Sequence, residues 1–129
     1  MQLTWQPDES PRAVSGIDGA RVRVGGEWRQ TSVWVNSTQM QDWPPRDFTE
    51  INADALDALL AAGPEVILLG TGSKTRLLAP ALLARVMHRG CGIECMSNAA
   101  AARTYNVLLG ENRAVLVAFL VEQATPSDH

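Results

Sequence analysis

The spacing of hydrophobic positions changes near residue 51 and divides the chain into two parts. In the first part, residues 20–24 (ARVRV) alternate apolar and basic side chains, which is typical of a strand with one buried face. Residues 31–35 (TSVWV) are β-branched and aromatic, which favours a second strand, and the GGEWRQ segment between the two favours a turn. The two strands predict a β-hairpin. An irregular segment (1–18) precedes it, and a loop (36–47) follows, since the WPPR motif excludes a helix there.

In the second part, segments with helical spacing alternate with strand-like apolar runs. The expected elements are helix 53–62, strand 65–70, helix 80–90, strand 92–96, helix 97–110 and strand 113–121. Asn52 suits an N-cap, Pro80 suits a first helical residue, and Ser97 or Asn98 caps the last helix. The alternation predicts right-handed crossovers between parallel strands. We therefore expect an α/β fold with a central mixed, mainly parallel sheet, about three helices packed on it and an N-terminal β-hairpin.

The apolar stripes of the helices indicate which side chains enter the core. In the first helix, Leu56, Leu59 and Leu60 are expected to face inward. The expected inward residues of the second helix are Leu82, Leu83, Val86 and Met87. Leu77 and Leu78, which precede that helix, are expected to fold back onto the core.

The chain has 129 residues, which fits one domain, and 46% of them are hydrophobic, which is enough for a core. We expect a single domain over residues 1–129 with frayed ends. The net charge is −3 and the basic residues are scattered, which argues against a nucleic-acid surface. No window reaches the roughly 18 apolar residues of a membrane span, and the N-terminus has no basic segment followed by an apolar core. These features predict a cytoplasmic protein.

The two cysteines are spaced C-x3-C, with Cys91 directly before the expected strand 92–96 and Cys95 within it. At the rise of a strand their Cα atoms would lie about 13 Å apart, whereas a disulfide needs about 7 Å or less. A metal site would need further ligands, and only His88 is close in sequence. We therefore expect two small buried apolar residues, and neither a metal nor a cofactor.

A glycine-containing turn, GTGSKT, directly follows strand 65–70, where α/β folds often place ligand loops. A dinucleotide fingerprint would need a third glycine where Thr75 stands, and a P-loop would need its lysine one place before Lys74. Two interpretations remain: a nest of backbone N–H groups that holds a small anion, or a tight turn with solvated polar residues. The candidate residues are Gly70, Thr71, Gly72, Ser73, Lys74 and Arg76.

A second group of polar residues belongs to the last expected helix. The candidates are Ser97, Asn98, Arg103, Thr104, Tyr105 and Asn106. Ser97 and Asn98 stand where strand meets helix, which favours capping over catalysis. Consecutive helical residues point in different directions, so residues 103–106 do not all line one site. His88 and His129 are the only histidines and no G-x-S-x-G motif occurs, so we expect no catalytic triad and name no catalytic residue.

The four tryptophans fall within the first third of the chain. They are Trp5, Trp28, Trp34 and Trp43. We expect part of this set to pack under the hairpin. Exposed members would instead form a protein-binding patch, because aromatic anchors dominate interface energetics.

Three segments together resemble a known family: EVILLGTGSK, IECMSNAAAARTYNVL and RAVLVAFL. This is a family of domains of unknown function that includes the mitochondrial respiratory complex I assembly factor and small bacterial and archaeal proteins. The matching residues are Gly70, Thr71, Gly72, Ala101, Thr104, Tyr105 and Asn106. The resemblance covers about residues 15–121 and implies a single α/β domain without an established catalytic activity. It also implies that the mitochondrial relative acts by binding other proteins.

The resemblance and the missing catalytic constellation favour a protein-binding module with an assembly-factor-like role in respiratory complex biogenesis. The alternative is a protein that binds a small anion or a nucleotide-related ligand, or an enzyme of unknown reaction. This alternative rests on the glycine turn and the basic residues beside it. The candidate residues of the turn and of the last helix are the expected ligand or partner surface.

Overall fold

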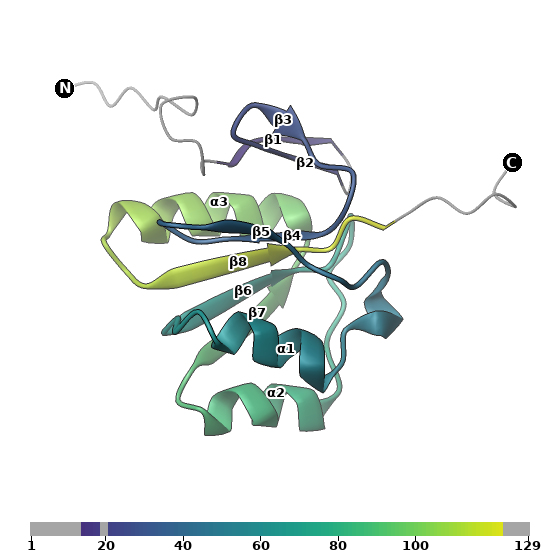
Figure 1. Ribbon diagram of the computed structural model, residues 1–129, viewed down its shortest axis with the longest axis vertical. Coiled ribbons are helices and arrows are strands. Elements are labelled where there is room, and N and C mark those ends of the chain that lie inside the picture. Colours follow the sequence, from purple (N-terminus) through teal and green to yellow (C-terminus); the bar gives the residue numbers. More distant parts are fainter. Residues whose placement is uncertain (1–13, 19–20, 123–129) are drawn as a thin grey trace, which may run out of the picture.

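A computed structural model describes residues 14–18 and 21–122 of the chain. Within these ranges the chain forms two sheets, three α-helices and a short 3₁₀ helix (Figure 1). The elements are β1 (Val14–Asp18), β2 (Arg21–Val24), β3 (Glu27–Trp28), β4 (Val33–Val35), β5 (Met40–Asp42), η2 (Phe48–Glu50), α1 (Ala53–Leu60), β6 (Val66–Gly70), α2 (Pro80–His88), β7 (Gly92–Met96), α3 (Asn98–Gly110) and β8 (Val115–Phe119). The single domain over residues 1–129 stays a prediction, and its frayed ends lie outside the described residues.

The larger sheet has five strands in the order β5-β4-β8-β6-β7. Strand β6 lies between β8 and β7 and runs parallel to both, as the alternation of strands and helices predicts. Strand β4 adds to β8 in the antiparallel sense, and β5 adds to β4 in the same way. The expected α/β fold with a mixed central sheet and three helices is therefore confirmed.

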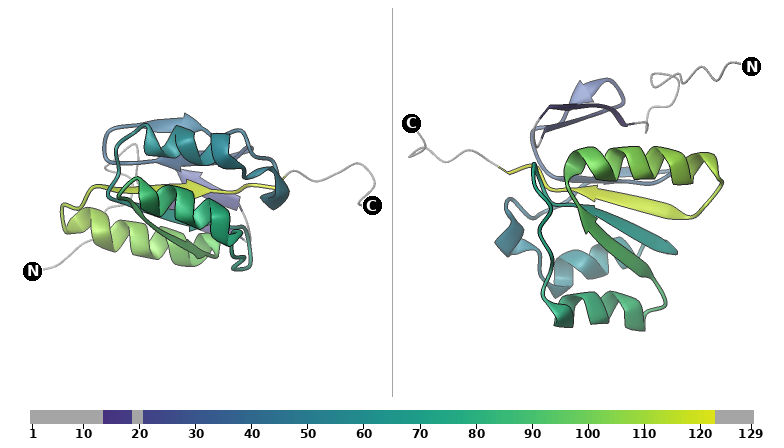
Figure 2. Two further views of the ribbon diagram at one scale, coloured as in Figure 1. Left: turned by 90° about the horizontal axis from the view of Figure 1, so that it is seen from below. Right: turned by 180° about the vertical axis from the view of Figure 1, so that it is seen from behind.

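The helices cover both faces of this sheet, with α3 on one face and α1 and α2 on the other (Figures 1 and 2). Successive strand residues point to opposite faces, so β6 contributes to two cores. Ile67 and Leu69 pack in the cluster that includes Leu56 of α1. Leu68 packs in the cluster that includes Tyr105 of α3. Strand β6 is thus buried on both faces, as its continuous apolar run predicts.

The expected N-terminal antiparallel unit is present as the three-stranded sheet β1-β2-β3, but the predicted pairing of residues 20–24 with residues 31–35 is wrong, because these two strands belong to different sheets. Gly25 and Gly26, both with positive φ, turn the chain back so early that β2 pairs with the short β3. The other neighbour of β2 is β1, which lies in the segment expected to be irregular. Strand β5 likewise lies in the segment expected to be a loop.

The three expected inward leucines of α1 (Leu56, Leu59 and Leu60) are buried. In and before α2, Val86 and Leu78 are buried, and Leu82 and Leu83 are half-buried. Met87 and Leu77 differ from the prediction, because their exposed fractions are 62% and 73%. The reason is that α2 lies at the outer edge of the molecule, where α1 and β7 pack against only one side of the helix (Figure 1).

Candidate functional site

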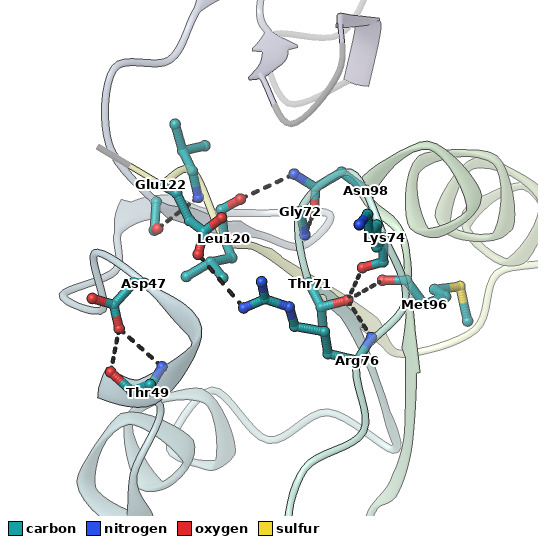
Figure 3. Close-up of polar contacts among 12 residues, drawn as sticks. Asp47, Thr49, Thr71, Gly72, Lys74, Arg76, Met96, Asn98, Leu120 and Glu122 are labelled. Carbon is teal, nitrogen blue, oxygen red and sulfur yellow. Dashed lines mark hydrogen bonds and ion pairs between the residues drawn. The ribbon is translucent and has the colours of Figure 1, made fainter. Parts of the chain in front are cut away.

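The turn after β6 is held together by the hydroxyl of Thr71, which is buried. This hydroxyl accepts a hydrogen bond from the backbone N–H of Arg76 at 3.0 Å. It donates to the Lys74 carbonyl at 2.6 Å, with the Met96 carbonyl as a second acceptor at 3.2 Å (Figure 3). Thr71 therefore folds the turn onto itself and fastens it to the end of β7.

Gly72 and Asn98 join the same turn to the start of α3. The Gly72 N–H donates to Asn98 Oδ1 at 3.1 Å, and the Gly72 carbonyl accepts from the Asn98 N–H at 2.7 Å. Asn98 Nδ2 donates to the Leu120 carbonyl at 3.0 Å (Figure 3). The side chain of Asn98 is fully buried, so these bonds are shielded from water. We call Gly70, Thr71, Gly72, Asn98 and Leu120 the clasp.

Gly70 is fixed in the clasp by close packing rather than by its backbone angles. Its carbonyl accepts a hydrogen bond from the Leu120 N–H at 3.0 Å. A Cβ atom at this position would overlap Asn98 Oδ1 and would lie 3.1 Å from Phe119 Cδ1 and 3.3 Å from the Ala118 carbonyl oxygen. Gly72 is different, because its φ of +99° is a conformation that side chains rarely adopt. The two glycines of GTG are therefore needed for different reasons, Gly70 for close packing and Gly72 for its backbone conformation.

An outer layer of contacts closes around the clasp. The Arg76 guanidinium pairs with the Glu122 carboxylate at 3.7 Å and lies over the Phe48 ring at 5.4 Å from its centroid. The hydroxyl of Ser32, just before β4, accepts a hydrogen bond from the Val121 N–H at 2.8 Å. Segments from four parts of the chain therefore meet at this end of the sheet.

The capacity of the turn for an anion depends on N–H groups that point outward. The N–H groups of Thr71, Gly72 and Arg76 donate instead to the Met96 carbonyl, Asn98 Oδ1 and the Thr71 hydroxyl. The side chains of Ser73 and Lys74 are exposed. These three N–H groups therefore serve the turn itself, and the exposed tip at residues 73–75 is what remains open to solvent.

Ser97 is the N-cap of α3, since its hydroxyl accepts a hydrogen bond from the Ala100 N–H at 3.2 Å. Asn98 also stands at this helix start, but its side chain points away from the cap to Gly72 and Leu120. Sequence reasoning assigned a cap to either residue. It missed the second role of Asn98, because both side-chain partners are distant in the chain.

The remaining candidates lie further along α3 and point in different directions, as helical geometry predicts. Arg103 is exposed, and Tyr105 is fully buried in the core. Thr104 donates its hydroxyl hydrogen bond to a carbonyl of its own helix at 2.9 Å. Asn106 Nδ2 donates to the Val14 carbonyl at 3.5 Å, toward the small sheet. The structure therefore brings Asn98 to the turn, while residues 103–106 line no common site with it.

Two of the three described tryptophans belong to the core. The exposed fractions of Trp34 and Trp43 are 8% and 2%, whereas that of Trp28 is 37%. Trp5 lies outside the described residues. The indole N–H of Trp43 donates to the Ala55 carbonyl of α1 at 3.1 Å. Trp43 therefore fixes the proline loop against α1 and forms no exposed patch.

A hollow of about 520 Å³ lies where this loop meets α1. Its lining residues are Pro44, Pro45, Thr49, Glu50, Asn52, Asp54, Ala55 and Ala58, and we call it the proline hollow. Two prolines and two alanines make part of the lining apolar, and Glu50 and Asp54 add two carboxylates, of which Glu50 pairs with Arg46 at 3.6 Å. Only the WPPR motif marked this region in the sequence, because the hollow depends on how the loop packs on α1.

Local hydrogen bonds fix the walls of the proline hollow. Asp47 Oδ1 accepts from the Thr49 N–H at 2.9 Å and caps η2 (Figure 3). The hydrogen bond from the Thr49 hydroxyl lowers the pKa of the Asp47 carboxyl. Asn52 Oδ1 accepts from the Ala55 N–H at 2.9 Å and caps α1. The hollow is therefore built from capped helices.

The cysteines are free thiols, and burial raises the pKa of both Cys91 and Cys95. Among the residues that the structure describes, no three or more His, Cys, Asp or Glu side chains gather closely enough to hold a metal ion.

Comparisons with known proteins found one matching family model and similar proteins from bacteria and a vertebrate. A family model described as "Protein of unknown function (DUF498/DUF598)" matches residues 14–120. The "13 kDa major membrane protein" of Francisella tularensis is 33% identical over 92 residues, which cover 70% of this chain and 74% of that protein. The "NADH dehydrogenase [ubiquinone] 1 alpha subcomplex assembly factor 3" of Xenopus tropicalis is 28% identical over 88 residues, which cover 67% of this chain and 48% of that protein.

The fold is shared with solved structures. A protein of Bordetella pertussis described as "a Mth938-like domain" superposes with a TM-score of 0.79 at 26% identity, and the match covers 100% of this chain and 98% of that one. The fold is therefore Mth938-like. Within the described ranges no helix has the length and apolar character needed to cross a membrane. Because one relative is named a membrane protein, the cytoplasmic location stays a prediction.

Proposed function

The chain belongs to the DUF498/DUF598 family of proteins of unknown function, and from this premise we propose that it is a protein-binding module with an assembly-factor-like role. The observation that carries the proposal is the similarity to the Xenopus tropicalis assembly factor, at 28% identity over 88 residues. The matched region is 48% of that relative. Because less than half of that relative is matched, a role of this chain in respiratory complex biogenesis is also a proposal.

The clasp supports this proposal over the ligand-binding alternative. An anion nest needs several free N–H groups, and those of Thr71, Gly72 and Arg76 have acceptors within the protein. Arg76, one of the two cations beside the turn, already pairs with Glu122. The roles of Gly70, Thr71 and Gly72 are then explained by folding, because these residues hold the end of the sheet together.

The proline hollow is the partner surface in this proposal. Pro44, Pro45, Ala55 and Ala58 give the lining an apolar part, while Asp54 adds a negative charge and Glu50 already pairs with Arg46. A partner that fits this surface inserts an apolar side chain and carries a basic residue beside it. Because the capped helices and Trp43 fix the walls, little ordering entropy is lost on binding.

The proposal is tested by affinity capture with purified wild-type protein as bait and mass spectrometry as the readout. Ala58→Arg places a long cationic side chain in the hollow, and Ala61→Arg places the same side chain on an exposed position outside it. We expect a partner that wild type and Ala61→Arg enrich and that Ala58→Arg does not.

Two results would count against the proposal in different ways. If no protein is enriched over a bare-tag control, the protein-binding function is wrong. If all three baits enrich the same partner equally, the proline hollow is not its site. A shift of the melting temperature by phosphates or nucleotides would favour the ligand-binding alternative.

A further inference from the structure

The outer face of the small sheet β1-β2-β3 carries an aromatic ring that the core does not use. Trp28 of β3 is 37% exposed, whereas Val22 and Val24 of β2 are buried. Trp28 pairs with Arg23 of β2, and Arg23 pairs with Gly16 of β1, so these three residues form one row across the sheet. Residues directly opposite each other on paired strands share a face. Because side chains alternate along β2, this row lies on the face opposite to the buried valines.

Gly16 leaves room for the indole to lie across this row. A Cβ atom at Gly16 would lie 3.4 Å from Trp28 Cη2 and 3.4 Å from Arg23 Cβ, so the ring reaches past Arg23 to β1. The guanidinium carbon of Arg21 lies over the same ring, at 4.6 Å from its centroid. Arg21 and Arg23 are two positions apart on β2, so both side chains leave the sheet on the side of the ring.

The two arginines of β2 form no ion pair among the residues that the structure describes. The small sheet also contains two acidic residues. Glu27 of β3 pairs with Arg29 at 3.8 Å. Asp18 is exposed and stands opposite Arg21 in the register of β1 and β2, but the Arg21 guanidinium lies over the indole instead. The outer face therefore presents two cations and one carboxylate, on a protein whose net charge is −3.

The stacking on the indole leaves Arg21 able to bind a carboxylate. A guanidinium that lies on an aromatic ring uses its flat side, and its N–H donors stay available in its plane. These donors form a fork that matches the two oxygens of a carboxylate. Because the ring already restricts the side chain of Arg21, less conformational entropy is lost when a partner binds. Trp and Arg are also the residue types that are enriched among interface hot spots.

We propose that the face formed by Arg21, Arg23 and Trp28, which we call the tryptophan face, binds an extended acidic segment of a partner protein. Alternate residues on a strand are about 6–7 Å apart, so two carboxylates at alternate positions of an extended segment match the spacing of the two arginines. A nucleic acid is disfavoured, because a surface that follows its phosphates needs a longer stripe of cations.

The tryptophan face is separate from the proline hollow. The two share no residue, and the small sheet lies at the end of the described molecule opposite α2 (Figure 1). The inference therefore does not rest on the proposed function.

The test is an NMR titration of the ¹⁵N-labelled full chain, because it detects weak binding and also locates it. The probe is a pentapeptide with blocked ends and glutamate at its second and fourth positions, and the control peptide has glutamine at both. The indole N–H signal of Trp28 is assigned by its absence in Trp28→Phe. We expect the glutamate peptide to cause saturable shifts of this signal and of the β2 amide signals. The glutamine peptide should cause much smaller shifts.

Two variants test the side chains of the tryptophan face. Arg21→Gln/Arg23→Gln removes both cations and should weaken binding of the glutamate peptide by about tenfold or more. Its matched control is Arg89→Gln/Arg103→Gln, which removes the same charge from exposed positions outside the small sheet and should bind like wild type. Trp28→Ala should also weaken binding by about tenfold, as measured from the β2 amide signals. Circular dichroism establishes that each variant is folded.

The proposal is overturned if neither peptide shifts these signals in wild type, or if both peptides shift them equally. It is also overturned if the two double variants lose binding equally, because the attraction then depends on net charge and not on this face. Shifts with a short oligothymidylate but none with the glutamate peptide would assign the face to nucleic acid and overturn the proposal as well. Because the titration contains only this chain and a synthetic probe, its failure leaves the affinity-capture test of the proposed function unaffected.

Discussion

Asn98 and Gly72 are joined by two reciprocal hydrogen bonds, although 26 residues separate them in the chain. The Asn98 N–H donates to the Gly72 carbonyl at 2.7 Å, and Asn98 Oδ1 accepts from the Gly72 N–H at 3.1 Å. Asn98 Nδ2 also donates to the Leu120 carbonyl at 3.0 Å. One buried side chain therefore ties the turn after β6 and the start of α3 to the end of β8.

Replacing Asn98 with leucine should destabilise the protein strongly. The change removes the side-chain hydrogen bonds to Gly72 and Leu120 and leaves the Gly72 N–H and the Leu120 carbonyl buried without that partner, which costs about 2–4 kcal/mol of unfolding free energy. Urea denaturation measures this loss. The control is Asn106→Leu, because Asn106 is half-buried and makes only a 3.5 Å bond to the Val14 carbonyl. Equal losses of unfolding free energy in the two variants would show that the Asn98 hydrogen bonds stabilise the protein no more than the single bond of Asn106.

Gly70→Ala should also destabilise, by about 1–3 kcal/mol, because a well-packed site must shift to accept one more carbon. The added Cβ would overlap Asn98 Oδ1 and would crowd Phe119 and Ala118. Gly110→Ala is the matched control, since nothing lies within 4 Å of a Cβ at that position. In a thermal melt, the control should be as stable as wild type or slightly more stable. A neutral effect of Gly70→Ala would contradict the packing described for the clasp.

Ser32→Ala tests the outer layer of the clasp. Ser32 is buried, and its hydroxyl accepts the 2.8 Å hydrogen bond from the Val121 N–H. Its loss should lower the unfolding free energy by about 1–2 kcal/mol, because the N–H stays buried. Ser73→Ala removes an exposed hydroxyl from the turn and should be nearly neutral. If guanidinium denaturation shows a larger loss of stability for Ser73→Ala than for Ser32→Ala, the stabilising role of the Ser32 hydrogen bond is contradicted.

The ion pair between Asp57 and Arg85 predicts a pH dependence. The hydrogen bond from Arg85 lowers the pKa of Asp57 below its usual value. A lowered folded-state pKa adds stability above the unfolded pKa of about 3.9, and this contribution is lost as the pH falls through the folded value. The difference in urea midpoint between wild type and Asp57→Asn should therefore be largest near neutral pH and should shrink in acid. A difference that does not change with pH would exclude this linkage.

The second half of the fold was predictable from the sequence because its signals are local. The apolar run of β6, Asn52 before α1 and Pro80 at the start of α2 each mark an element without help from distant residues. The N-terminal strands were not predictable in the same way. Strand β5 has exposed polar residues, and β4 finds its neighbour β8 about 80 residues further along the chain.

The candidate site was predictable only in part. The glycine motif and the polar start of α3 mark residues that do meet in the structure. Their role depends on the path of β8, because the Leu120 carbonyl accepts from Asn98. The exposure of Met87 could not be predicted from the sequence either. A helical pattern shows an apolar arc, but not how much of it the neighbouring elements cover.

The most direct test of the protein-binding proposal is the dissociation constant of a captured and purified partner. It would be measured by calorimetry against wild type, Ala58→Arg and Ala61→Arg. If the proline hollow is the binding surface, Ala58→Arg should weaken binding by about tenfold or more, as expected for a residue at the centre of an interface, and Ala61→Arg should bind like wild type. Equal dissociation constants for all three proteins would contradict the account of this surface.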